Sequence, residues 1–237
     1  MGTSTSFRAP PVPRWQAFAA ALRSDVPLDR LRSELFNAGF EWEPALADAS
    51  VASFAVQVML SFETLPGRLR ASDRPEAAIL NVAADARRAS AESGSSSAAL
   101  PLAERALVGA LMRTIASDVS LSELSAQEAA SRFERQRGEP RELLGSFLGE
   151  LLSQYARYVT AREMGAMSAS RTSDDAGPPG LSVSQSKRVA RSLAAEADSV
   201  GRRVGEVPDS VEGVRRRWPA LIGEAFERGR ELPEPLR

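Results

Sequence analysis

The sequence predicts an all-α fold, an irregular multi-helix bundle with a tethered C-terminal helical module. Three observations support this prediction. Hydrophobic residues make up 43% of the 237 residues, but aromatic residues make up only 6% and alanine is abundant, a composition that favours helix over sheet. Apolar residues recur three and four positions apart in most segments. One internal stretch rich in Ser, Asp, Gly and Pro breaks this pattern and divides the chain.

The N-terminal part predicts a disordered start followed by two short helices. Residues 1–13 are rich in Ser, Thr and Pro, so we expect them to be disordered. The helical bundle is expected over residues 14–166. Its first two helices begin near Trp15 and Pro27, and the second ends at Gly39, because glycine suits the C-terminus of a helix.

The next segment predicts the central helix of the bundle. Its apolar side chains point around the whole circumference of a helix, which is typical of a buried helix. They are Val51, Phe54, Val56, Val58, Met59, Leu60, Phe62 and Leu65. A membrane span is not favoured, because the run is short and contains Gln57, Ser61 and Glu63. We expect this helix to end at the Pro66–Gly67 pair.

Two further helices are expected to begin at prolines, which suit the first turn of a helix. These are Pro75 and Pro101, and a Ser- and Gly-rich loop separates the two segments. A third helix is expected before Gly138. It has two candidate capping boxes, in which a serine and a glutamate three residues later satisfy the first amides of a helix. The pairs are Ser120 with Glu123 and Ser125 with Glu128.

The segment 140–163 has the strongest helical pattern in the chain. One half of its helical wheel is apolar, as in a core helix of a bundle. These residues are Leu143, Leu144, Phe147, Leu148, Leu151, Leu152, Tyr155, Tyr158 and Val159. Gly145 and Gly149 flank this face and would let another backbone approach closely, so a seam between two copies is the alternative. The remaining strip is expected to face solvent: Ser146, Glu150, Ser153, Arg157 and Thr160.

The C-terminal part differs from the bundle in its pattern. Residues 167–180 have the composition of a flexible linker, and residues 181–237 are expected to form a helical module. The apolar stripe of its first helix is narrow and contains Val189, Leu193, Ala197, Val200 and Val204. Such a stripe suits a single facing helix. It either docks on a partner or folds back onto the bundle, and the sequence leaves both arrangements open.

The composition argues against most common enzyme chemistry. The chain has no His, no Cys and a single lysine, Lys187. Ser-His-Asp and Cys-His arrangements, metal sites built on His or thiolate ligands, and the usual phosphate-binding loop with its lysine therefore cannot form. The carboxylates of Glu41 and Glu43 are interpreted as solvated charges. We predict no enzyme activity, and no catalytic, cofactor-binding or metal-binding residues.

Charge gives only a weak indication of nucleic-acid binding. The formal net charge is −1, which implies no polyanionic partner for the whole molecule. Five arginines near Trp218 form a candidate nucleic-acid-binding cluster, since guanidinium groups beside an aromatic ring suit phosphates and a stacked base. They are Arg202, Arg203, Arg215, Arg216 and Arg217. The interpretation as a solvated face is preferred, because the C-terminal part is only slightly more basic than the rest.

These observations predict a non-enzymatic helical adaptor or accessory subunit. We expect it to dock on a protein partner, or on a second copy of itself, through Val189, Leu193, Val200 and Val204 of the C-terminal helices. The alternative is a nucleic-acid-associated accessory subunit that uses the arginine cluster. No signal-peptide-like apolar segment and no long apolar run is present, so a cytoplasmic location without membrane association is expected.

Overall fold

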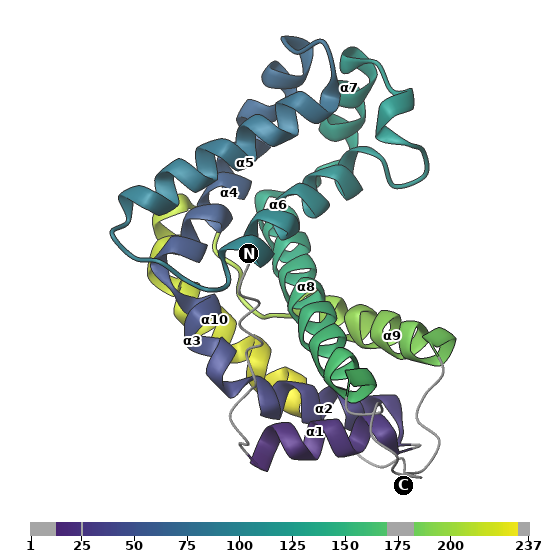
Figure 1. Ribbon diagram of the computed structural model, residues 1–237. Helices are drawn as coiled ribbons and strands as arrows, with labels where there is room; N and C mark the ends of the chain where they lie inside the picture. Colours follow the sequence, from purple (N-terminus) through teal and green to yellow (C-terminus); the bar gives the residue numbers. More distant parts are fainter. Residues whose placement is uncertain (1–12, 25, 170–182, 232–237) are drawn as a thin grey trace, which may run out of the picture.

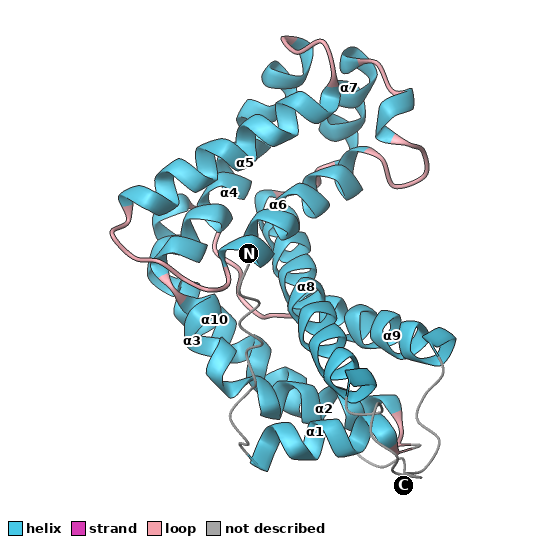
Figure 2. Cartoon of the chain, in the orientation of Figure 1, coloured by secondary structure: helices cyan, strands magenta, loops and turns pink. Residues whose placement is uncertain are grey.

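The computed structural model describes residues 13–24, 26–169 and 183–231. Over these residues the chain folds into packed helices without strands, which confirms the predicted all-α multi-helix fold (Figure 1, Figure 2). The predicted disordered segment 1–13 lies outside the described residues except for Pro13. The predicted linker 167–180 also lies outside them, except that its first three residues continue a helix.

The helices follow one another through mostly short connections. Their bounds are α1 Pro13–Arg23, α2 Leu28–Ala38, α3 Trp42–Ala47, α4 Ala49–Arg70, α5 Pro75–Glu92, α6 Leu100–Ile115, α7 Ala126–Gln136, α8 Pro140–Ala169, α9 Val183–Arg202 and α10 Val211–Arg230. Two 3₁₀ turns, Gly39–Glu41 and Leu121–Glu123, join α2 to α3 and α6 to α7.

Helix α4 is the hub of the bundle. It packs against α5, α6, α7, α8 and α10. Asp48 caps its first turn by accepting a hydrogen bond from the Ser50 amide at 2.8 Å, and it also accepts one from the Ser95 hydroxyl at 2.9 Å. The hydrogen bond from the Ser50 hydroxyl lowers the pKa of the Asp48 carboxyl below its ordinary value. Asp48 therefore ties the start of α4 to the segment that follows α5.

The predicted end of α4 at Pro66 is wrong, because the helix continues to Arg70 with this proline inside it. Proline has no amide hydrogen, so the Phe62 carbonyl one turn earlier lacks its usual helical donor. Arg137, at the C-terminus of α7, donates to this carbonyl from Nη1. Its guanidinium also lies 4.1 Å from the centroid of the Phe62 ring. An arginine from another helix thus replaces the missing backbone hydrogen bond.

Of the two predicted capping boxes, one is confirmed. Ser125 accepts a hydrogen bond from the Glu128 amide, and the Glu128 carboxylate accepts one from the Ser125 amide at 2.9 Å. Ser120 makes no such cap, because the chain after it forms a 3₁₀ turn instead of an α-helix. The helix therefore begins five residues later than the first candidate pair would place it.

Helix α8 is a core helix, as its pattern predicts. Its apolar residues from Leu143 to Val159 are buried, except that Tyr158 is 43% exposed. The expectation that the polar strip of α8 faces solvent is wrong for most of the strip. Ser146, Glu150, Ser153 and Thr160 are buried, and only Arg157 is exposed. Helices α6 and α9 pack along α8 and cover this strip.

The C-terminal helices are part of the same core as the bundle. Helix α9 packs mainly along α8, and α10 packs on α2, α3 and α4. Leu193 of α9 and Trp218 of α10 belong to one continuous cluster of buried side chains with the residues of the bundle. Of the two arrangements left open by the sequence, the structure has the folded-back one.

Helix α10 runs through Pro219 without a break. Its position is fixed by Trp218, whose indole Nε1 donates to the Leu46 carbonyl at 2.9 Å. Pro219 itself is exposed, so water can reach the Arg215 carbonyl that lacks its helical donor. A proline is tolerated inside this helix for that reason.

The compensation of Pro66 by Arg137 can be tested with a double-mutant cycle. Arg137→Ala should lower the free energy of unfolding by about 1–3 kcal/mol, because the Phe62 carbonyl loses its donor. In a Pro66→Ala background the residue at position 66 donates to that carbonyl itself, so the same change should cost less. Urea denaturation of the four proteins measures the difference. Equal costs in both backgrounds would show that Arg137 acts only through its contact with the ring.

Candidate functional site

The residues predicted to dock on a partner lie inside the molecule. Leu193 is 0% exposed, and Val200 and Val204 are also buried. Val189 is partly buried and packs against the same core. In this conformation the stripe is occupied by the bundle and offers no free surface to a partner.

The stripe reaches α8 through two glycines that bring the backbones together. A Cβ atom added at Gly201 of α9 would lie 2.6 Å from the Gly149 amide nitrogen and 2.7 Å from its Cα. Gly149 is the second glycine of the GxxxG spacing identified in the sequence. The first, Gly145, has nothing within 4 Å of the position of an added Cβ. Of the two glycines in the GxxxG spacing, only Gly149 lies at the close contact between α8 and α9.

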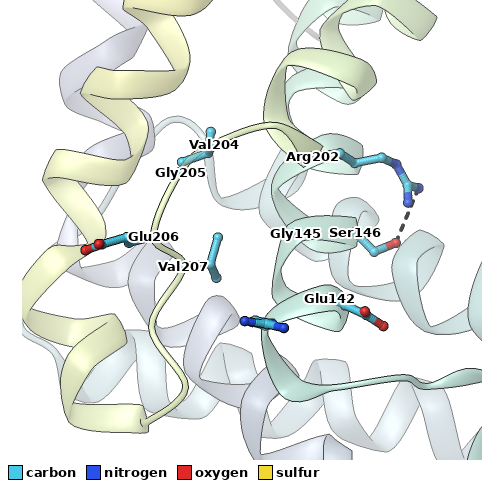
Figure 3. A pocket seen from close by; sticks show the side chains of 9 residues that line it. Glu142, Gly145, Ser146, Arg202, Val204, Gly205, Glu206 and Val207 are labelled. Atoms are coloured by element: carbon cyan, nitrogen blue, oxygen red, sulfur yellow. Dashed lines mark hydrogen bonds between the residues drawn. The ribbon is translucent and has the colours of Figure 1, made fainter.

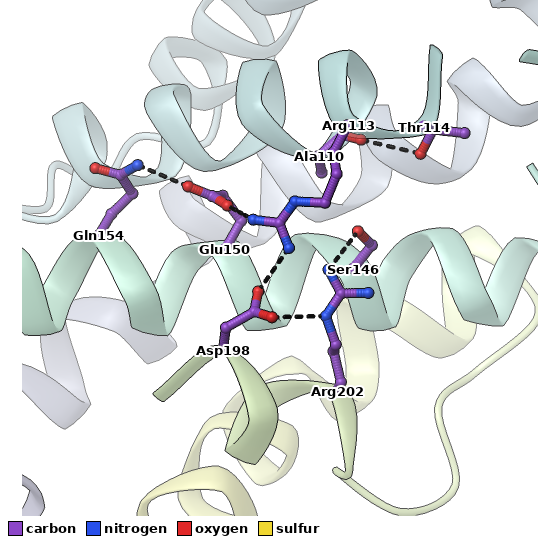
Figure 4. A network of polar contacts seen from close by, with 8 residues as sticks. All are labelled: Ala110, Arg113, Thr114, Ser146, Glu150, Gln154, Asp198 and Arg202. Carbon is purple, nitrogen blue, oxygen red and sulfur yellow. Dashed lines mark hydrogen bonds and ion pairs between the residues drawn. The ribbon is translucent and has the colours of Figure 1, made fainter. Parts of the chain in front are cut away.

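A polar network closes the junction of α6, α8 and α9 (Figure 4). Arg113 of α6 forms ion pairs with the buried Glu150 of α8 and with Asp198 of α9, the latter at 2.9 Å. Gln154 donates to the other Glu150 oxygen at 2.7 Å. Arg202 pairs with Asp198 at 2.8 Å. Glu150 and Ser146 on the polar strip of α8 are thus buried with partners supplied by two other helices, whereas the buried Thr160 hydroxyl has no hydrogen-bond partner among the described residues.

The predicted nucleic-acid cluster does not form one free cationic surface. Arg202 is bound to Asp198 and contacts the Ser146 hydroxyl at 3.4 Å. Arg203 donates to the Ser199 hydroxyl and Arg217 to the Glu206 carbonyl. Arg215 and Arg216 are exposed, and neither has an ion-pair partner among the described residues. Three of the five guanidinium groups are therefore already engaged within the chain.

A cavity of about 490 Å³, lined by apolar and charged residues, lies between the first turns of α8 and the loop from α9 to α10 (Figure 3). It contains two basic side chains, Arg141 and Arg202, and two acidic ones, Glu142 and Glu206. Arg141 pairs with Glu139 at 2.7 Å. Because the charges balance and the arginines have partners, this cavity has no excess charge with which to hold an ion.

The described residues contain no carboxylate cluster placed to hold a metal ion, and the ionisable side chains of Glu43 and Tyr155 have structural partners. No group of three or more carboxylates among them is placed to share a metal ion. Glu43 is paired with Arg230 at 2.7 Å. The Tyr155 hydroxyl donates to the Leu35 carbonyl at 3.1 Å, and burial raises the pKa of this phenol above its ordinary value. Tyr155 therefore stays protonated as a structural donor.

A groove lined by both apolar and polar side chains lies over α4. Its volume is about 460 Å³ and it lies between α5 and α10, which both pack on α4. The floor contains Ala49, Ala52, Ser53, Val56, Gln57 and Leu60. The walls contain Ala89 and Glu92 of α5 with the adjoining Ser93, and Arg215, Trp218 and Pro219 of α10. We call these residues, with Ala47, the α4 groove.

The environment of Leu60 differs from the one that the sequence pattern predicts. The apolar pattern around α4 predicted burial on every side, but Leu60 is 42% exposed. It lies at one end of the floor, while small side chains lie at the other end. A helix with alanine and serine at its surface lets another helix approach closely. On this face of the hub helix, Ala49 and Leu60 are therefore left exposed, while Ala52 and Val56 between them are buried.

Other large apolar side chains are exposed singly. Phe40 is 56% exposed and lies 4.9 Å from the guanidinium of Arg14, and Tyr158 is packed edge-on against Trp42. Leu80 of α5 is 55% exposed and does not line the α4 groove. Scattered apolar side chains of this kind are normal on protein surfaces.

No protein family model, curated protein or solved structure matches this chain, so its function is inferred from its own residues.

Among the described residues, no single helix is both long and apolar enough to cross a membrane. The bent pair Leu28–Ala47 and Ala49–Arg70, with 70° between its halves, meets the criteria of length and composition only when both are taken together.

The contact between α8 and α9 can be tested with two alanine substitutions. Gly201→Ala should lower the free energy of unfolding by about 1–3 kcal/mol, because its Cβ meets backbone atoms that cannot move aside. Gly145→Ala is the matched control on α8, where open space and better helix propensity should raise stability by about 0.5–1 kcal/mol. Urea denaturation measures both changes. If Gly201→Ala is neutral, α9 does not pack on α8 as described.

Proposed function

We propose that this protein is a non-enzymatic accessory subunit that binds a protein partner in the α4 groove. The observation that carries the proposal is the open face of α4, where Leu60 is half-exposed in a groove between two helices. Burying a leucine side chain completely contributes about 1.5–3 kcal/mol. Leu60 is 42% exposed, so a partner that covers it gains less than half of this contribution, and the exposed part of the side chain is suited to a partner.

The position of the groove also supports a docking role. The floor belongs to the helix with neighbours on most of its sides, and the walls are helices α5 and α10 from distant parts of the sequence. Docking surfaces held on a rigid scaffold lose little conformational entropy when a partner binds. The bundle can therefore present the groove in a fixed shape.

The chemistry of the groove favours binding over catalysis. Its ionisable side chains are Arg215 and Glu92, both exposed, on walls formed by different helices. The chain has no histidine or cysteine to act as an acid, base or nucleophile near neutral pH. A nucleic-acid-associated subunit has less support, because Arg202, Arg203 and Arg217 are bound to acceptors within the chain.

The docking proposal can be tested by introducing a charge into the groove. Leu60→Asp should abolish the association with proteins that co-purify from native cells, because an unpaired carboxylate would be buried in the complex. Leu80→Asp is the matched control, since Leu80 has similar exposure and lies outside the groove. Both variants should keep a melting temperature close to that of the unchanged protein.

A photo-crosslinking residue at position 60, compared with one at position 80, identifies what occupies the groove. The proposal expects a protein adduct from position 60 that is missing from position 80. It fails if the two positions give the same adducts, or if Leu60→Asp and Leu80→Asp have equal effects on association.

A further inference from the structure

We infer that the partner element held by the α4 groove is an amphipathic α-helix of about three turns, with an acidic residue on its edge toward α10 and a basic residue on its edge toward α5. This inference rests on the proposed function, since it names the partner of the same site. It follows from the length of the groove, the residues of its floor and the charges on its two walls.

The floor has the size and spacing of a helix contact. Ala49, Ser53, Val56 and Leu60 recur at intervals of four, three and four residues along one face of α4. Ala49 and Leu60 are exposed, Ser53 is half-buried, and Val56 is buried beneath them. The distance along the helix axis from Ala49 to Leu60 is about 16 Å at 1.5 Å per residue, or about three turns. Helical grooves of this kind receive an amphipathic helix through anchors spaced three, four and seven residues apart. The described part of the chain offers no strand whose edge could receive an extended peptide.

The two walls carry opposite charges at the same end of the groove. Glu92 lies at the C-terminus of α5, which is held beside the start of α4 by the hydrogen bond from Ser95 to Asp48. Arg215 lies one turn before Trp218, which is fixed to the Leu46 carbonyl at the same end. Both charges are exposed and neither belongs to an ion pair within the described residues.

The charges and the leucine together define the partner's pattern. A bound helix would place a carboxylate beside Arg215 and an ammonium or guanidinium group beside Glu92, on the two edges of its apolar stripe. Leu60, two to three turns of α4 away, would meet an apolar anchor at the other end. The helix cannot be turned end for end without losing both ion pairs. The walls therefore fix the direction of the partner as well as its position.

A second copy of this chain fits the groove less well. In a symmetric pair in which two copies face each other groove to groove, the floor of each groove stays without a contact. A convex helix fills a concave groove, and close packing is what makes such contacts favourable. A separate helix therefore suits the groove better than a groove-to-groove pair of copies.

Designed peptides test this inference directly. The probes are helical peptides of 14 residues with one apolar stripe, which carry glutamate on the edge toward α10 and lysine on the edge toward α5. Control peptides have the same composition with these two residues exchanged, and each peptide is made in both chain directions. Fluorescence anisotropy measures the dissociation constants, and methyl NMR of Leu60 shows whether the peptide occupies the groove.

We expect one matched peptide to bind at least ten-fold more tightly than its exchanged control, with a preference that decreases as salt rises. In the double variant Arg215→Glu with Glu92→Arg, the preference should reverse. The double variant is compared with the unchanged protein by circular dichroism, so that a loss of fold is recognised.

Each other outcome overturns the inference in a recognisable way. Equal binding of matched and exchanged peptides in the groove leaves the docking function standing and removes the charge pattern. If no peptide binds, the occupant is not such a helix. The same conclusion follows if the photo-crosslinker at position 60 gives an adduct only with a second copy of this chain. If position 60 also gives no protein adduct in cells, the proposed function fails as well.

Discussion

The close contact between Gly149 and Gly201 determines how the second half of the molecule is placed. At this point the backbones of α8 and α9 approach without room for a side chain. The contact holds α9 along α8, and the short connection after Arg202 then delivers α10 to α2, α3 and α4. The α10 wall of the groove, with Arg215 and Trp218, exists because α9 returns to the bundle. A larger side chain at Gly201 would therefore disturb the α4 groove, although Gly201 itself does not line it.

At Pro66 and at the polar strip of α8, neighbouring helices supply polar partners that the helix itself does not provide. Arg137 donates to the carbonyl that Pro66 leaves open, and Arg113 pairs with Glu150 on a strip of α8 that would otherwise face water. In both cases a guanidinium group reaches a polar group from a neighbouring helix. A charge pair buried in this way contributes little net stability, but removing one partner is costly. These contacts consequently specify which helices lie together.

Helical spacing in the sequence predicted most of the helices, because the burial of one face leaves a regular pattern. It did not predict which helix covers which face. Serine, glutamate and threonine on α8 are equally compatible with water and with a polar interface, so the strip around Glu150 was assigned to solvent. The narrow stripe around Leu193 suits a partner or the chain's own α8 equally well. Gly149 and Gly201 were the available signal, since two small residues on different helices permit a close crossing. Leu60 was assigned to the core because a pattern that is apolar on all sides does not show that one neighbouring helix is missing.

The location of the groove implies that binding and folding are coupled. Its walls come from α5 and α10, so a bound helix would contact parts of the chain that meet only when the C-terminal helices are folded back. A ligand that binds only the native arrangement stabilises it by about 2.7 kcal/mol at a concentration of one hundred times its dissociation constant. That amount is comparable to the expected cost of disturbing the α8–α9 contact. A partner in the α4 groove would therefore hold α10, and through it α9, in place, and the two halves of the molecule would respond to its binding as one unit.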